Sequence, residues 1–98
     1  MFDIEKFKSF MEDKLEVAVE LDEVGQEAVL LDHDELDESL ILEAELKLLP
    51  NPVLFQLYSY QAEHEWIVGV AIEEATYNPL FLVCLKDGER VYHQVFKQ

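Results

Sequence analysis

The stretch Ser39–Leu49, SLILEAELKLL, decides how the sequence is interpreted. Leucine or alanine falls on every second residue, and three charged residues stand between them. Successive side chains of a strand point to opposite faces, so this alternation predicts a strand with one apolar and one polar side. Glu, Ala, Leu and Lys also favour helix, which is the competing interpretation. The unbroken period of two decides for a strand on which both halves of the chain pack.

The sequence before this stretch predicts a helix followed by a hairpin. Asp3 can cap a helix, and apolar residues then recur at spacings of three and four, so Asp3–Lys14 is expected to be helical. Glu16–Leu21 alternates and is expected to be a strand. A turn that ends at Gly25 leads to a returning strand at Gln26–Leu31.

The sequence after this stretch predicts a second helix and three strands. Asn51 can cap a helix that begins at Pro52 and runs to about His64, although the aromatic residues of this segment also fit a strand. Asp87-Gly88 is a strong signal for a two-residue hairpin turn. The strands are expected at Trp66–Ile72, Leu80–Leu85 and Arg90–Phe96.

The expected order of elements is therefore α-β-β-β-α-β-β-β. Runs of neighbouring antiparallel strands with two helices indicate the α+β class, here an antiparallel sheet with an N-terminal helix and a second helix. The chain has 98 residues, of which 50% are hydrophobic, and this suffices for one core. We expect residues 1–98 to form a single α+β domain.

Composition predicts a protein of a reducing compartment. The single cysteine, Cys84, lies in an apolar run, cannot form an internal disulfide and is expected to fill the core. The N-terminus lacks the features of a secretory signal. The longest uncharged run, Ala75–Leu85, has eleven residues and is too short to span a bilayer. These features predict a cytoplasmic location and no membrane partner.

Charge is the most unusual feature of the composition, with 22 acidic and 7 basic residues and a net charge of −15. Fourteen of the acidic residues lie between Glu12 and Glu45, where Lys14 is the only base. Such an excess repels phosphate, so direct nucleic-acid binding is disfavoured. It can attract a basic protein, for instance by mimicking the charge of nucleic acid, or it can merely keep the protein soluble. The residues expected to bind a partner are Glu16, Glu20, Asp32, Asp34, Glu35, Glu43 and Glu45.

No motif points to catalysis or to a cofactor. With three glycines in the chain, no phosphate-binding loop is present. Asp32 and Asp34 have the spacing of a calcium loop, but the central glycine and the third oxygen ligand are missing. His64 is expected at the surface, and the alternation around His93 is compatible with a place in the core. We expect no catalytic residue, no metal and no cofactor.

These observations favour a non-enzymatic binding protein, namely an inhibitor, adaptor or chaperone, for a basic or partly unfolded protein. The alternative is a small metal-dependent hydrolase that uses the acidic loop Asp32–Asp37. The strands Trp66–Ile72 and Leu80–Leu85 carry apolar residues on both faces, and each face must be covered. We therefore also expect a homodimer that buries part of the sheet.

Overall fold

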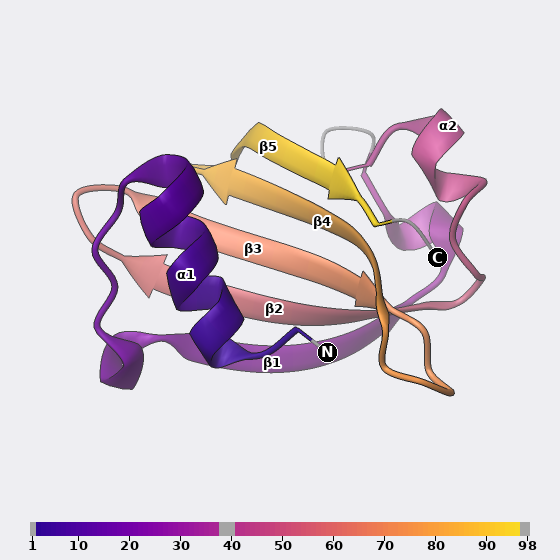
Figure 1. The fold of residues 1–98 in the computed structure, drawn as a ribbon. Coiled ribbons are helices and arrows are strands. Elements are labelled where there is room, and N and C mark those ends of the chain that lie inside the picture. Colours follow the sequence, from indigo (N-terminus) through magenta and orange to yellow (C-terminus); the bar gives the residue numbers. More distant parts are fainter. Residues whose placement is uncertain (1, 38–40, 97–98) are drawn as a thin grey trace.

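A twisted five-stranded antiparallel sheet lies between two helical layers in the computed structural model, which describes residues 2–37 and 41–96 (Figure 1). The strands are neighbours in the order in which they follow along the chain. The α+β class, the antiparallel sheet and the N-terminal helix predicted from the sequence are confirmed. The strands are β1 (Gly25–Leu31), β2 (Val53–Gln61), β3 (Glu65–Ile72), β4 (Pro79–Lys86) and β5 (Glu89–Val95).

The first helical layer is helix α1 (Ile4–Leu15), and each of its ends lies within one residue of the predicted range Asp3–Lys14. The Asp3 carboxylate accepts a hydrogen bond of 3.0 Å from the backbone N–H of Lys6 and so caps the first turn. At the other end, Glu16 adopts a left-handed conformation with φ of 56°. Phe7 and Met11 are fully buried against the sheet. The Phe7 ring stacks on Tyr58 with 5.3 Å between the ring centroids.

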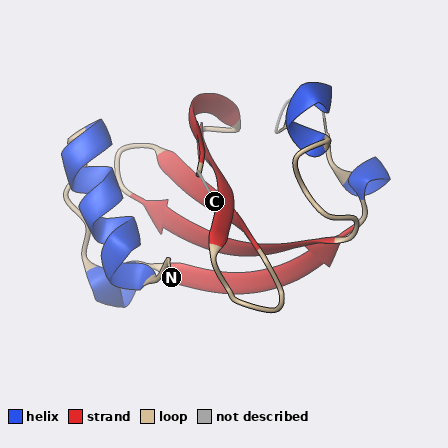
Figure 2. Ribbon diagram, turned by 45° about the vertical axis from the view of Figure 1, so that its right-hand side comes forward, coloured by secondary structure: helices blue, strands red, loops and turns tan. Residues whose placement is uncertain are grey.

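The second layer covers the opposite face (Figure 2) and is built from residues 32–37 and 41–50. It contains a 3-10 turn, η2 (His33–Glu35), and the one-turn helix α2 (Glu43–Leu46). Ile41 and Leu49 are buried in this layer. They belong to a second apolar cluster, whose sheet residues are Val53, Phe55, Ala71, Phe81 and Val83.

The strand predicted at 39–49 is wrong. Residues 39 and 40 lie outside the described part of the chain, and the rest of this stretch forms α2 and its flanking turns. Leu42, expected on the apolar side of a strand, is 53% exposed. Helix propensity prevails because the Glu45 carboxylate accepts a hydrogen bond of 2.9 Å from the backbone N–H of Leu42, which stabilises the start of a helical turn.

The helix predicted from Pro52 to about His64 is also wrong, since this segment is the strand β2. Val53 and Phe55 are buried on one face of the sheet, while Tyr58 and Tyr60 are buried on the other. A strand covered on both faces shows no alternation of polar and apolar residues, so its pattern can be mistaken for a helix. Its β-branched and aromatic residues favour a strand instead.

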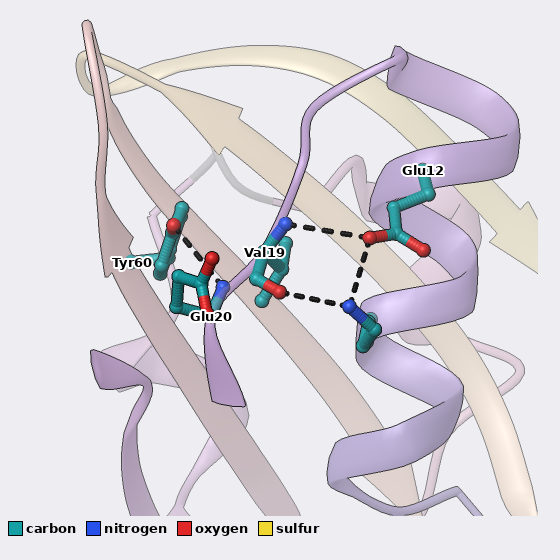
Figure 3. A network of polar contacts seen from close by, with 5 residues as sticks. Glu12, Val19, Glu20 and Tyr60 are labelled. Carbon is teal, nitrogen blue, oxygen red and sulfur yellow. Dashed lines mark hydrogen bonds and ion pairs between the residues drawn. The ribbon is translucent and has the colours of Figure 1, made fainter. Parts of the chain in front are cut away.

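The strand predicted at Glu16–Leu21 is absent as well, and β1 pairs with β2 rather than with this segment. The backbone of this segment bonds to side chains instead (Figure 3). The Lys8 ammonium donates to the Val19 carbonyl at 2.9 Å, and the backbone N–H of Glu20 donates to the Tyr60 hydroxyl at 3.2 Å. The alternating pattern of Glu16–Leu21 reflects the burial of Val19 beside α1 and not a strand. The observed order of helices and strands is therefore α1-β1-α2-β2-β3-β4-β5.

The other strands agree with the sequence. β1, β3, β4 and β5 lie within one or two residues of the expected ranges. The turn between the last two strands places Asp87 and Gly88 at φ of 51° and 85°, the positive values that a type I′ hairpin requires.

Candidate protein-binding trough

An apolar hollow of about 240 Å³ lies between the sheet and the second layer. All of its lining residues are apolar. Side chains of the second layer form one wall, and alternate residues of the strands form the floor. The lining residues are Leu31, Leu36, Ile41, Phe55, Leu57, Ile67, Gly69, Val83 and Leu85.

This hollow continues into two further depressions along the same face of the sheet, and neighbouring depressions share lining residues. Leu57 and Ile67 also line the middle depression, together with Gly25, Gln26, Glu27 and Ser59. Gly25, Ser59 and Ile67 then line the third, together with Glu23, Tyr60, Gln61 and Glu65. We call the three depressions together the trough. It is apolar at one end and carries carboxylates at the other.

The described residues that line the trough include no lysine and no arginine. Its acidic half is formed by the carboxylates of Glu23, Glu27 and Glu65. On β1, Glu27 alternates with Val29 and Leu31, so these three side chains share the face on which the trough lies. The trough therefore combines an apolar cavity with an uncompensated negative rim.

Arg90 does not balance this charge, because it is already engaged on the second layer. Its guanidinium makes a two-fold contact with the Glu45 carboxylate, at 2.9 and 2.7 Å. Both side chains are largely buried, with exposed fractions of 15% for Arg90 and 11% for Glu45. The hydrogen bonds from Arg90 hold the pKa of Glu45 below its usual value. This ion pair ties α2 to β5.

The structure does not bring the seven predicted partner-binding residues together. Glu16 caps α1 and lines a separate depression beside His64 and Trp66. Glu20 is exposed where its backbone meets Tyr60.

The remaining five predicted residues lie in the second layer. The Glu35 carboxylate accepts from the backbone N–H of Asp32 at 3.2 Å and so stabilises η2, on which Asp34 is exposed. Glu43 is exposed on α2, whereas Glu45 is used internally. None of the seven lines the trough, although η2 supports its wall residue Leu36.

The acidic residues of the trough were missed by the sequence reasoning. Glu27 stands in a strand that was correctly expected, and its alternation with Val29 and Leu31 could have placed it beside the apolar face. Glu23 and Glu65 carried no comparable signal. They come together only because β2 and β3 bring the turn before β1 next to the start of β3.

The side chains that could take part in a chemical reaction are either buried or in contact with other residues. Cys84 is fully buried, and burial raises the pKa of its thiol to about 12, so it is not a nucleophile at neutral pH. The Nδ1 atom of His64 lies 2.7 Å from the Asp87 carboxylate. The pKa of Asp87 is lowered chiefly by the hydrogen bond from the backbone N–H of Glu65 and, to a smaller extent, by the hydrogen bond with His64. The His93 side chain is 53% exposed, so it does not lie in the core.

The acidic loop 32–37 does not form a metal site with a histidine. His33 instead contacts the carbonyl oxygen of Pro50 through Nε2 at 2.6 Å. Within residues 2–37 and 41–96, no three His, Cys, Asp or Glu side chains are grouped so that they could hold a metal ion.

Comparison of the chain with protein-family models, with curated proteins and with solved structures gives no match. No helix in the described part of the chain has the length and apolar character needed to cross a membrane.

Proposed function

We propose that this protein is a non-enzymatic binding module, an inhibitor, adaptor or chaperone, that takes a segment of a basic or partly unfolded protein into the trough. The observation that carries the proposal is the gradation of the trough from an apolar end to an acidic end. A segment with an apolar side chain followed by lysine or arginine matches this gradation.

The two ends of the trough contribute differently. Burial of one Leu, Ile or Phe side chain contributes about 1.5–3 kcal/mol, so the apolar end supplies most of the affinity. Exposed carboxylates gain little from each ion pair, about 0–1 kcal/mol, but they speed association and reject acidic segments. The proposed partner is therefore selected by charge and held by its apolar side chain.

Charge variants separate local recognition from general attraction to an acidic protein. The first variant carries Glu23→Gln, Glu27→Gln and Glu65→Gln. The matched control carries Glu5→Gln, Asp13→Asn and Glu74→Gln, which are exposed residues outside the trough. Both variants lose three negative charges. The probe is an octapeptide of four valines followed by four lysines, titrated by calorimetry at low and at physiological salt.

We expect the trough variant to bind the peptide about ten-fold more weakly and the control to bind it nearly as tightly as wild type, since only the former loses carboxylates next to the peptide. Equal weakening in both variants would mean that the acid acts only through net charge. An octapeptide of four serines followed by four lysines should bind weakly to all three proteins, because it has no apolar side chain for the hollow.

A second pair of variants tests the apolar end. Ile67 lines all three depressions and is partly exposed, so Ile67→Arg should block the trough and abolish peptide binding. Val91 is another β-branched strand residue, 47% exposed on β5 and outside the trough, and Val91→Arg is the control. Circular dichroism of both variants verifies that they fold. Undiminished binding by Ile67→Arg would place the site elsewhere.

A further inference from the structure

The outer edge of β1 is an open strand edge. β1 lies at one end of the sheet and pairs only with β2, in an unbroken antiparallel register from Gly25↔Ser59 to Leu31↔Val53. No other described strand pairs with its outer side. Its residues are exposed except for Val29 and Leu31, which are half-buried. An edge of this kind leaves alternate backbone N–H and C=O groups free to pair with another chain.

β1 also lacks the features by which proteins commonly protect an edge. It contains no proline, no lysine and no bulge, and its one charge, Glu27, lies on the trough face. Leu30 is 54% exposed on the other face. The opposite edge of the sheet, β5, differs because its register with β4 is irregular and it carries Arg90 and His93. β1 is therefore the edge that is better suited to accept a strand.

The trough reaches this edge at Gly25. Gly25 lines the middle and acidic depressions, and a Cβ atom at this position would lie 2.5 Å from the Ser59 hydroxyl. The absence of a side chain keeps the trough open towards the edge. A strand placed beside β1, at the usual spacing of about 4.8 Å, would turn every second side chain towards the trough.

We propose that the partner segment binds as a sixth strand along the outer edge of β1, with trough-facing side chains that are apolar near Leu31 and basic near Glu23 and Glu27. This inference rests on the proposed function and adds its binding mode. Main-chain hydrogen bonds would provide affinity without regard to sequence, and the trough would select the side chains. Such a mode suits a partly unfolded partner, whose backbone is free to pair.

Charge decides which strand fits. The segment 15–46, with β1 at its centre, contains no lysine or arginine. A second copy would place two chains of net charge −15 edge to edge, whereas a basic strand meets Glu23 and Glu27 favourably. The occupant is therefore a basic extended segment of another protein rather than a second copy.

Amide hydrogen exchange on the intact, isotope-labelled chain tests this mode, with the octapeptide of four valines and four lysines as the probe. β2 already protects one alternate set of β1 amides. We expect the peptide to slow exchange of the other set, so that protection appears at every second residue of β1. Binding that shifts the methyl signals of Leu57 and Ile67 but leaves the exchange of β1 unchanged would overturn strand addition and leave the proposed function standing. No binding at all would overturn both.

Peptides with N-methyl groups provide a test that leaves the protein unaltered. One peptide is methylated on every odd-numbered backbone nitrogen and the other on every even-numbered backbone nitrogen. An added strand directs only one of these sets towards β1, so we expect one peptide to lose about ten-fold or more in affinity and the other to bind nearly as the parent. Equal affinity for both peptides would contradict the proposal. Concentration-dependent protection of β1 without peptide would identify a second copy as the occupant and would also contradict it.

Discussion

Glu45 shows at the scale of one residue how a charge can have a role opposite to the expected one. The sequence suggests a free carboxylate for a partner, but the structure buries Glu45 against Arg90, at 2.7 Å. Replacement by glutamine leaves the Arg90 charge without its bidentate partner. We expect Glu45→Gln to lower the free energy of unfolding by about 1.5–3 kcal/mol in urea denaturation. Glu43→Gln, an exposed substitution on the same short helix, should change it by less than about 0.5 kcal/mol.

The same ion pair predicts a dependence on pH. Because Arg90 holds the pKa of Glu45 below its usual value of 4.5, the folded protein binds this proton less readily than the unfolded chain. The stabilisation is therefore complete above the unfolded pKa and is lost as the pH falls through the folded pKa. We expect the stability difference between wild type and Glu45→Gln to be constant between about pH 7 and 6 and to shrink towards pH 3. A difference that persisted unchanged at pH 3 would contradict this origin.

Helix α1 contributes to stability at the scale of an element through its buried face. Phe7 is fully buried and stacks on Tyr58, with an angle of 14° between the rings. We expect Phe7→Ala to cost about 3–5 kcal/mol of unfolding free energy, because it leaves a cavity between α1 and the sheet. Ser9→Ala on the exposed face of α1 is the matched control and should be nearly neutral. Urea denaturation followed by the fluorescence of Trp66, which is buried in the same cluster, measures both.

Which elements could be predicted depends on how much of each was decided locally. α1 has a cap and a regular apolar stripe, and the β4–β5 hairpin has Asp87-Gly88, so nearby residues were sufficient. β2 is buried on both faces, and nothing within it distinguishes that state from a helix. In 39–49 a strand pattern competed with helix propensity. The helical turn is stabilised by the local hydrogen bond from Leu42 to Glu45 and also by the pair of Glu45 with Arg90, which lies far along the chain and cannot be predicted from the stretch itself.

The candidate site was less predictable than the fold for the same reason. The described carboxylates between Glu12 and Glu45 are spread from the end of α1 to α2, and of these only Glu23 and Glu27 line the trough. The trough joins them to Glu65, which lies on β3 and is separated from β1 by β2. The hollow itself exists only because the second layer does not cover Ile67 and Leu57 completely. No local pattern encodes such incomplete coverage.

At the scale of the whole molecule, the structure weakens the argument that led us to expect a homodimer. Both faces of β3 and β4 carry apolar residues, as expected, but α1 covers one face and the second layer covers most of the other. The apolar surface that was expected to require a second copy is thus largely buried within one chain. The dimer stays a prediction, and light scattering at micromolar concentration tests it against the monomer mass of 11.4 kDa.

Net charge leads to a prediction for the molecule as a whole. Even if all 7 bases were paired, 15 of the 22 acidic residues would have no basic partner. The molecule extends 33 Å in its longest direction, comparable to the screening length of about 30 Å in 0.01 M salt, so at that salt concentration its charges repel one another across the whole fold. The expanded unfolded chain keeps these charges farther apart, so the repulsion destabilises the folded state.

We therefore expect sodium chloride to stabilise the protein at pH 7. Between 0.01 and 1 M salt the screening length falls to about 3 Å, and the midpoint of urea unfolding should rise as the repulsion is screened. Sodium chloride is preferable to sulfate, which stabilises proteins by exclusion from their surface whatever their charge. The control is the same titration near the isoelectric point of about 4.3, where net repulsion vanishes and the effect should largely disappear. An equal rise at both pH values would show that salt acts on apolar burial rather than on charge. A fall at pH 7 would mean that the ion pairs Arg90–Glu45 and Lys8–Glu12 stabilise the fold by more than the net repulsion destabilises it.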